Sequence, residues 1–278
     1  MIVPMTDLAD QGFLDIDGVR LEYRMIGPRP SAAPTLLLLH EGLGSVAIWG
    51  DFAQKLSEAT RLGVFTYSRQ GYGNSSKAVL PRSVNFMHEE ARLVLPKVLD
   101  AIGFQSGVLI GHSDGGSIAA IYGGSFQDHR VLGLVLIAAH FFTEEMGLAE
   151  IRRARESFEK GELRAKLARA HADPDGAFWS WCRPWLDPDF VKWDITEELA
   201  HIRVPILLIQ GEQDQYGTAQ QLEVAQEECY CPVEIVLLPN TRHAPHRESP
   251  QATLAAIKEF VARLLRNQKT GAFKTVAG

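Results

Sequence analysis

One stretch of nine residues, Val108 to Gly116, constrains the fold of this chain more than any other. It begins as an apolar run, continues as Gly-x-Ser-x-Gly centred on Ser113, and passes into an apolar pattern with helical spacing. A sharp turn from strand to helix forces its central residue into a strained backbone conformation, and the flanking glycines let strand and helix approach closely. We therefore predict that the Ser113 hydroxyl projects beyond the strand, at a helix N-terminus whose dipole favours developing negative charge.

Apolar runs along the chain predict a mostly parallel sheet with helices on both faces. Continuous apolar runs are typical of strands that are buried on both sides, and stretches with helical spacing separate them here. Strands that alternate with helices along a chain form a doubly wound α/β sheet. The predicted strands are 35–39, 62–67, the run before Ser113, 131–139, 204–210 and 233–238.

Two segments outside those strands have more specific patterns. Asp17-Gly18 lies between alternating runs within residues 13–25, which predicts a hairpin. Residues 84–102 have helical spacing but contain Pro96, and an interior proline predicts a kink or an interruption of the helix.

Residues 142–203 interrupt the alternation of strands and helices. A charged, helix-prone part is followed by four of the chain's five tryptophans within about fifteen residues, and no strand is indicated. We predict that this segment is an inserted helical cap over the strand ends, and that residues 1–141 and 204–278 form the α/β core. The aromatic side chains of the cap either line a substrate pocket or pack the cap onto the sheet.

Charge and apolar patterning exclude several classes of protein. The net charge is −6 and no basic block is present, so nucleic acid is an unexpected partner. No apolar run approaches the ~18 residues that a membrane span needs, and the N-terminus lacks the pattern of a signal peptide. The three cysteines form neither a CxxC pair nor a disulfide framework. A reducing compartment fits this usage, and we expect a cytoplasmic protein.

Three residues that follow predicted strands form a candidate catalytic triad, Ser113, Asp214 and His243. A serine hydroxyl is a weak nucleophile at neutral pH, so it needs an imidazole to take its proton and later return it. A carboxylate must hold that imidazole in the right tautomer and stabilise its cation. Glu212 is an alternative to Asp214, and His246 is an alternative to His243.

A glycine-rich loop after the first parallel strand is the candidate oxyanion site. Residues 40–45 read His-Glu-Gly-Leu-Gly-Ser, and we predict that the backbone N–H of Gly42 and that of Asp114 hold a substrate oxyanion. An ordinary strand-to-helix turn is the alternative for this loop. The predicted substrate contacts are Leu43, Trp179, Trp181 and Trp185.

In these motifs the chain resembles the α/β-hydrolase fold family, specifically its small capped members, over roughly residues 13–266. The motifs are 39–45, Gly-Tyr-Gly-Asn-Ser at 71–75, Gly-His-Ser-Asp-Gly-Gly at 111–116, Gly-Glu-Gln-Asp at 211–214 and 243–248. The resemblance implies a hydrolase that uses no cofactor and no metal. The family has His-Gly where this chain has His40-Glu41. An ionised Glu41 that points inward would oppose an oxyanion, so we expect it to point away or to be hydrogen-bonded.

The sequence therefore predicts a serine hydrolase that cleaves a small-molecule carboxylic ester or related acyl compound through an acyl-enzyme. One alternative on the same fold is hydrolysis of a carbon–carbon bond in an aromatic ring-cleavage product. A receptor with a silent triad is a second alternative, and a lyase or oxygenase that uses the same pocket is a third. Fold analogy does not choose among substrates, and the sequence does not indicate an oligomeric state.

Overall fold

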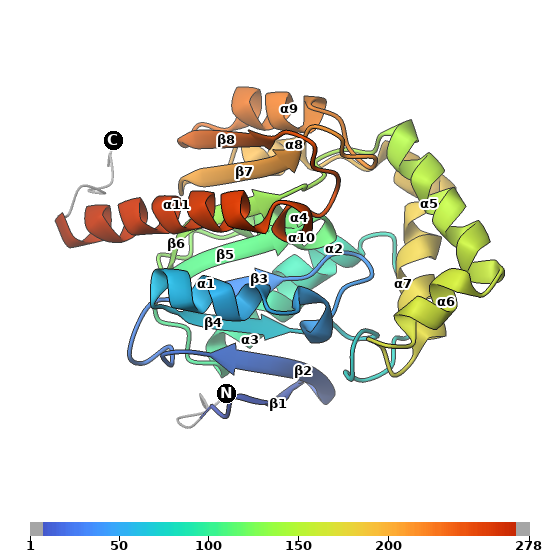
Figure 1. The fold of residues 1–278 in the computed structure, drawn as a ribbon, viewed down its shortest axis with the longest axis horizontal. Coiled ribbons are helices and arrows are strands. Elements are labelled where there is room, and N and C mark those ends of the chain that lie inside the picture. The colour runs from blue at the N-terminus through green and yellow to red at the C-terminus, as the bar shows by residue number, and fades with distance from the viewer. Residues whose placement is uncertain (1–7, 271–278) are drawn as a thin grey trace.

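Eight strands form one twisted sheet at the centre of the computed structural model, which describes residues 8–270 (Figure 1). The order across the sheet is β1-β2-β4-β3-β5-β6-β7-β8, and every pair from β4 to β8 is parallel. The prediction about a signal peptide concerns an N-terminal segment that lies partly outside the described residues. The strands are β1 (Gln11–Ile16), β2 (Val19–Ile26), β3 (Thr35–Leu39), β4 (Gly63–Tyr67), β5 (Gly107–His112), β6 (Val131–Ile137), β7 (Ile206–Gly211) and β8 (Val233–Leu238).

The predicted hairpin is confirmed at the edge of this sheet. β1 and β2 pair in antiparallel register, with Ile16 opposite Val19. Asp17 and Gly18 between them have φ values of 54° and 82°, as a type I′ turn requires at both central positions. β2 then pairs antiparallel with β4, which makes the sheet mixed at this edge.

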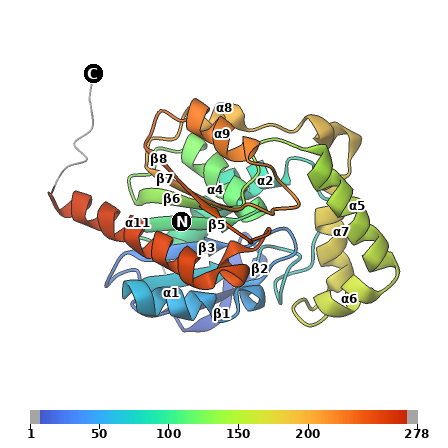
Figure 2. The same ribbon diagram turned by 45° about the horizontal axis from the view of Figure 1, so that its top comes forward.

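Alternate residues of the central strands supply the apolar contacts of the two sheet faces. In β3, Leu36 and Leu38 pack toward α1 (Phe52–Thr60) and α11 (Pro250–Thr270), whereas Leu37 and Leu39 pack toward the opposite layer. That layer contains α3 (Leu95–Ala101) and α4 (Asp114–Ser125). Helices cover both faces, so the doubly wound α/β class is confirmed (Figures 1 and 2).

Pro96 interrupts the predicted helix over 84–102. The segment divides into α2 (Phe86–Glu89), a π-helical turn (Glu90–Val94) and α3, with Pro96 in the first turn of α3. Proline has no N–H, and its ring collides with the carbonyl four residues earlier in a regular α-helix. The wider π-helical turn lies immediately before Pro96, where it avoids that collision.

Three strands are shorter than the sequence predicts: β4 begins one residue late, at Gly63, and β6 and β7 differ by more. β6 ends at Ile137 instead of residue 139, because Ala138 adopts a φ of 48° that a strand does not allow. β7 begins at Ile206 instead of residue 204, because Pro205 lacks the N–H that a ladder needs. Both changes leave the carboxyl ends of the strands at one edge of the sheet.

The segment between β6 and β7 is helical. It contains α5 (Glu145–Glu159), α6 (Glu162–Leu167), α7 (Pro174–Trp185), the 3₁₀ turn η3 (Pro188–Lys192) and α8 (Thr196–Leu199). In both views α5, α6 and α7 form a layer to the right of the sheet, beyond the carboxyl ends of its strands (Figures 1 and 2). α8 instead packs against α4.

The remaining helical elements of the described chain are the 3₁₀ turn η1 (Val46–Trp49), α9 (Gln220–Glu228) and α10 (Pro245–Glu248). Within residues 8–270, none of the helices combines the length and the apolar character needed to cross a membrane. The three cysteines are free thiols.

Candidate active site

Ser113 occupies a strained turn between β5 and α4, as predicted. Its φ and ψ are 52° and −121°, a combination that costs on the order of 1–3 kcal/mol for a residue with a side chain. A Cβ on Gly111 would lie 2.1 Å from the carbonyl oxygen of Gly115, and a Cβ on Gly115 would lie 2.1 Å from that of Leu39. Only glycines at both positions permit this approach of strand to helix, and the turn presents Ser113 at the helix N-terminus.

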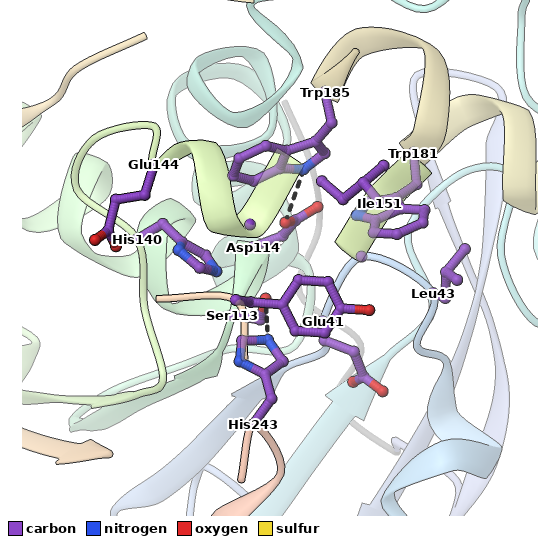
Figure 3. A pocket seen from close by; sticks show the side chains of 13 residues that line it. Glu41, Leu43, Ser113, Asp114, His140, Glu144, Ile151, Trp181, Trp185 and His243 are labelled. Atoms are coloured by element: carbon purple, nitrogen blue, oxygen red, sulfur yellow. Dashed lines mark hydrogen bonds between the residues drawn. The ribbon is translucent and has the colours of Figure 1, made fainter. Parts of the chain in front are cut away.

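The three predicted triad residues lie in one hydrogen-bonded chain. His243 Nε2 is 2.9 Å from Ser113 Oγ, and His243 Nδ1 is 2.8 and 2.9 Å from the two carboxylate oxygens of Asp214 (Figure 3 shows the first contact). An ionised carboxylate only accepts hydrogen bonds, so Nδ1 carries the proton and donates a hydrogen bond to Asp214. Nε2 of the neutral ring is then an acceptor, and the Ser113 hydroxyl donates to it.

Asp214 is held in the ionised form that this arrangement requires. It follows β7, is 8% exposed, and accepts a 2.8 Å hydrogen bond from the backbone N–H of Tyr216. Burial alone would raise the pKa of its carboxyl, but the hydrogen bonds from His243 and from the Tyr216 N–H bring that pKa below the ordinary aspartate value. The alternative acid, Glu212, is exposed, and among the described residues it is Asp214 whose carboxylate forms the hydrogen bonds to His243.

The loop that carries His243 is fixed on both sides of the imidazole. The Glu248 carboxylate accepts from the backbone N–H of Arg242 at 2.7 Å and from that of Ala244 at 3.1 Å. On the β5 side, His112 Nε2 donates to the carbonyl of His243 at 2.7 Å. These contacts orient the imidazole before any ligand binds.

His246 lies behind the site and does not face Ser113. It is 2% exposed, and its ring packs against Trp49, Phe52 and His112 at centroid distances of 4.7–5.4 Å. Burial lowers the pKa of His246 to about 3, which keeps the ring neutral in this apolar surrounding. The arrangement favours His243 as the base and gives His246 a packing position.

Hydrogen bonds to the carbonyl oxygens of Glu41 and Ser113 fix the two peptide planes that carry the N–H groups of Gly42 and Asp114. The carbonyl of Ser113 accepts from the N–H groups of Gly116 and Ser117 inside α4. The carbonyl of Glu41 accepts from the Arg69 guanidinium at 3.0 Å. In a trans peptide the following N–H points opposite to the carbonyl. The N–H groups of Asp114 and Gly42 are therefore directed away from these partners, and both residues line the same pocket.

Glu41 forms an ion pair instead of pointing into solvent. Its Oε2 is 3.5 Å from His112 Nδ1, and Figure 3 shows its carboxylate directed away from Ser113. Burial alone would raise the pKa of Glu41, but His112 brings it well below the ordinary glutamate value. The same pair raises the pKa of His112 against the opposing effect of its burial. The acid that departs from the family pattern is thus paired with the His112 imidazole and is not directed at Ser113.

A pocket of about 650 Å³, counting its open mouth, contains Ser113 and most of the predicted substrate contacts. Leu43, Trp181 and Trp185 line it. Trp179 does not: it packs on Phe158 and Phe178 on the other side of α7, with Arg155 and Arg183 over its ring. Adjacent helical positions face different directions, so three tryptophans of one helix do not all reach one pocket.

Five pocket residues were missed in the sequence: His140, Glu144, Gly147, Ile151 and Tyr216. His140 directly follows the strand ending near 139, and that position at the carboxyl edge is a signal that could have identified it. Burial and the nearby His243 lower the pKa of His140 to about 3, so this ring is neutral. Tyr216 packs its ring 4.6 Å from that of His243. Glu144 and Ile151 belong to the helical segment, whose contacts no local pattern predicts.

Comparison with known proteins agrees with this architecture. The profile of the alpha/beta hydrolase family matches residues 36–257. A bifunctional esterase/perhydrolase of Acinetobacter calcoaceticus is 25% identical over 229 residues, which cover 72% of this chain and 80% of that protein. A carboxylesterase structure from Nitrososphaera gargenis superposes with a TM-score of 0.75 at 17% identity, covering 92% of this chain and 100% of that one.

A membrane phospholipase A described as a bacterial virulence factor gives a TM-score of 0.74 at 25% identity, and the match covers 91% of this chain and 86% of that one. The family profile spans most of the sheet, from β3 to α11, and includes the strand-turn-helix around Ser113. On this match and on the observed fold, the chain belongs to the alpha/beta-hydrolase family.

Proposed function

We propose that this hydrolase cleaves carboxylic esters through an acyl-enzyme, with Ser113 as nucleophile, His243 as base and Asp214 as the group that orients it. The observation that carries the proposal is the position of His243, whose two ring nitrogens contact Ser113 and Asp214 at hydrogen-bond distance. The esterases among the similar proteins support the reaction class.

The proposed reaction has two halves. Ser113 Oγ attacks the ester carbonyl while its proton passes to His243 Nε2, and the N–H groups of Gly42 and Asp114 bind the oxyanion. The imidazolium then protonates the departing alcohol, leaving an acyl group on Ser113. Water loses its proton to His243 and attacks that acyl group, and the acid departs as Ser113 regains its proton.

The composition of the pocket favours esters over the carbon–carbon bonds of ring-cleavage products. Those products carry a carboxylate, which a basic side chain would bind. Among the described residues that line the pocket, none is lysine or arginine, and three are acidic.

We further propose that residues 142–203 act as the cap over the core, residues 1–141 and 204–278. The cytoplasmic location stays a prediction.

A turnover screen combined with labelling tests the proposal. We expect p-nitrophenyl esters to be hydrolysed faster than a ring-cleavage dienone, and an alkyl phosphonate fluoride to label one site, Ser113, with loss of turnover. Ser113→Ala should take up no label. Ser125→Ala, at the far end of α4, is the matched control and should label normally. Labelling of another serine, or turnover of the dienone alone, would refute the proposed function.

We predict that Trp181, and not Trp179, sets the acyl-chain preference. Trp181 packs over Gly42, where a Cβ would come within 2.2 Å of its indole, and it lines the pocket. Trp181→Ala should raise kcat/KM for octanoyl relative to acetyl p-nitrophenyl ester by about tenfold, within the range that one or two methylene contacts contribute. Trp179→Ala should leave that ratio within about twofold while lowering Tm. An unchanged ratio in Trp181→Ala would show that its ring only packs the helical segment.

A further inference from the structure

The pocket around Ser113 contains three carboxylates, and two of them already have partners. Glu144 accepts from the backbone N–H and hydroxyl of Thr218 and from the Gln221 amide. The Oε2 of Glu41 has no hydrogen-bond partner among the described residues, but it forms an ion pair with His112, 3.5 Å from its Nδ1, and the carboxylate is directed away from Ser113. The charge of each of these two carboxylates is therefore compensated within the protein.

The third carboxylate, that of Asp114, is only half satisfied. Its Oδ1 accepts a 3.2 Å hydrogen bond from the Trp185 indole N–H, while its Oδ2 has no hydrogen-bond partner among the described residues. The residue is 1% exposed. Figure 3 shows its carboxylate beside Ser113, with one oxygen on Trp185 and the other on the side of Ile151 and Trp181. A buried carboxylate oxygen without a donor is unfavourable, so the pocket favours a ligand that supplies one.

The two arginines whose charges act on Asp114 form their hydrogen bonds elsewhere. Arg69 donates to the carbonyls of His40 and Glu41. Arg82 pairs with Glu90 at 2.8 Å. Neither guanidinium lines the pocket. Burial raises the pKa of the Asp114 carboxyl above its ordinary value, and the charges of Arg69 and Arg82 oppose that effect. Both arginines leave its second oxygen available to a group that enters from the pocket.

We propose that the Asp114 side chain is a specificity site that binds an ammonium group of the substrate, close to the scissile carbonyl. Asp114 is adjacent to the nucleophile, and its own N–H is a proposed oxyanion donor. A substrate group that reaches its carboxylate while the carbonyl lies at Ser113 must therefore be within a few bonds of that carbonyl. An ammonium supplies both the missing donor and the opposite charge. The inference rests on the proposed ester hydrolysis and assigns its substrate class, amino-substituted esters.

Two matched pairs of esters test this site and distinguish the two ends of the substrate. Benzyl 3-aminopropanoate and benzyl butanoate differ by an ammonium in place of a methyl on the acyl side. 2-Aminoethyl butanoate and propyl butanoate place the same difference on the alcohol side. The acid released from each ester is measured by chromatography over time, which gives kcat and KM for all four esters at pH 7.

In at least one pair we expect the wild-type enzyme to prefer the ammonium ester by tenfold or more in kcat/KM. In Asp114→Asn, which keeps the backbone N–H, that preference should fall by tenfold or more, mainly through KM for the ammonium ester. Glu144→Gln is the matched control, since it removes the same charge from the same pocket. Its preference should change by less than threefold, because the Glu144 oxygens already have donors.

Two results would overturn the assignment. Equal preferences in wild type and Asp114→Asn would show that the carboxylate does not bind the ammonium. If Asp114→Asn and Glu144→Gln lose the preference for the ammonium ester equally, the preference comes from the overall negative charge of the pocket and not from Asp114. If neutral esters are hydrolysed in these cases, the proposed ester hydrolysis stands. If wild type hydrolyses none of the esters, the proposed function itself fails.

A measurement on wild type alone keeps the test valid should Asp114→Asn not fold. 3-Aminopropanamide and butanamide are compared as competitive inhibitors of ester turnover. The assignment expects the ammonium compound to bind at least tenfold more tightly, and equal inhibition contradicts it.

Discussion

His243→Ala is expected to lose nearly all turnover while it keeps its fold and its affinity for substrate. The imidazole contacts both Ser113 and Asp214, so its removal leaves the hydroxyl without a base and the carboxylate without its donor. Loss of the base in other serine hydrolases lowers kcat by a factor on the order of 10⁴ to 10⁶. Steady-state kinetics on p-nitrophenyl butyrate, with circular dichroism to confirm folding, measure this effect.

His246→Ala is the control three residues away. Its ring packs against Trp49, Phe52 and His112, away from Ser113, so the substitution opens a cavity but removes no group from the reaction. We expect most of the activity to remain and Tm to fall. A folded, inactive His246→Ala beside an active His243→Ala would reverse the assignment of the base.

The order of the site residues was readable in the sequence because each follows a strand whose pattern is strong. Ser113 lies in a turn that only flanking glycines permit. Asp214 comes soon after the buried strand β7, and His243 comes soon after the edge strand β8 of the same sheet. The carboxyl ends of parallel strands lie at one edge of the sheet. A correct prediction of the strands therefore also places these residues close together. Strand ends were the weaker part, since Ala138 and Pro205 shorten β6 and β7.

The pocket was less predictable because side chains from a helical segment complete it. Trp181 and Trp185 line the pocket and Trp179 does not, a difference set by how α7 is rotated against the sheet. Contacts between helices accompany that rotation, such as the stacking of Phe158 of α5 on Phe178 of α7 at 3.8 Å between ring centroids, and the sequence pattern of α7 alone does not reveal them. The ion pair between Glu41 and His112 could not be predicted either, because the sequence identifies His112 only as the residue before the nucleophile.

Asp214→Asn is expected to preserve the fold and lower kcat by a factor on the order of 10⁴, as the same change does in a related triad. The amide is almost isosteric with the carboxylate, but its NH₂ group is a donor. An asparagine here favours the tautomer of His243 in which Nδ1 accepts and Nε2 carries the proton. That ring has no lone pair for the Ser113 proton, and no negative charge stabilises the imidazolium. Kinetics on the folded variant, at saturating substrate, measure the loss.

Glu212→Gln is the matched control, because it makes the same chemical change two residues earlier on the same loop. Glu212 is exposed and lies outside the hydrogen-bonded chain of His243, so its charge reaches the imidazole only through solvent. We expect kcat within about twofold of wild type. The backbone N–H of Tyr216, which donates to Asp214 at 2.8 Å, should remain in place in both variants. A larger loss in Glu212→Gln than in Asp214→Asn would mean that the other acid of this loop orients the base.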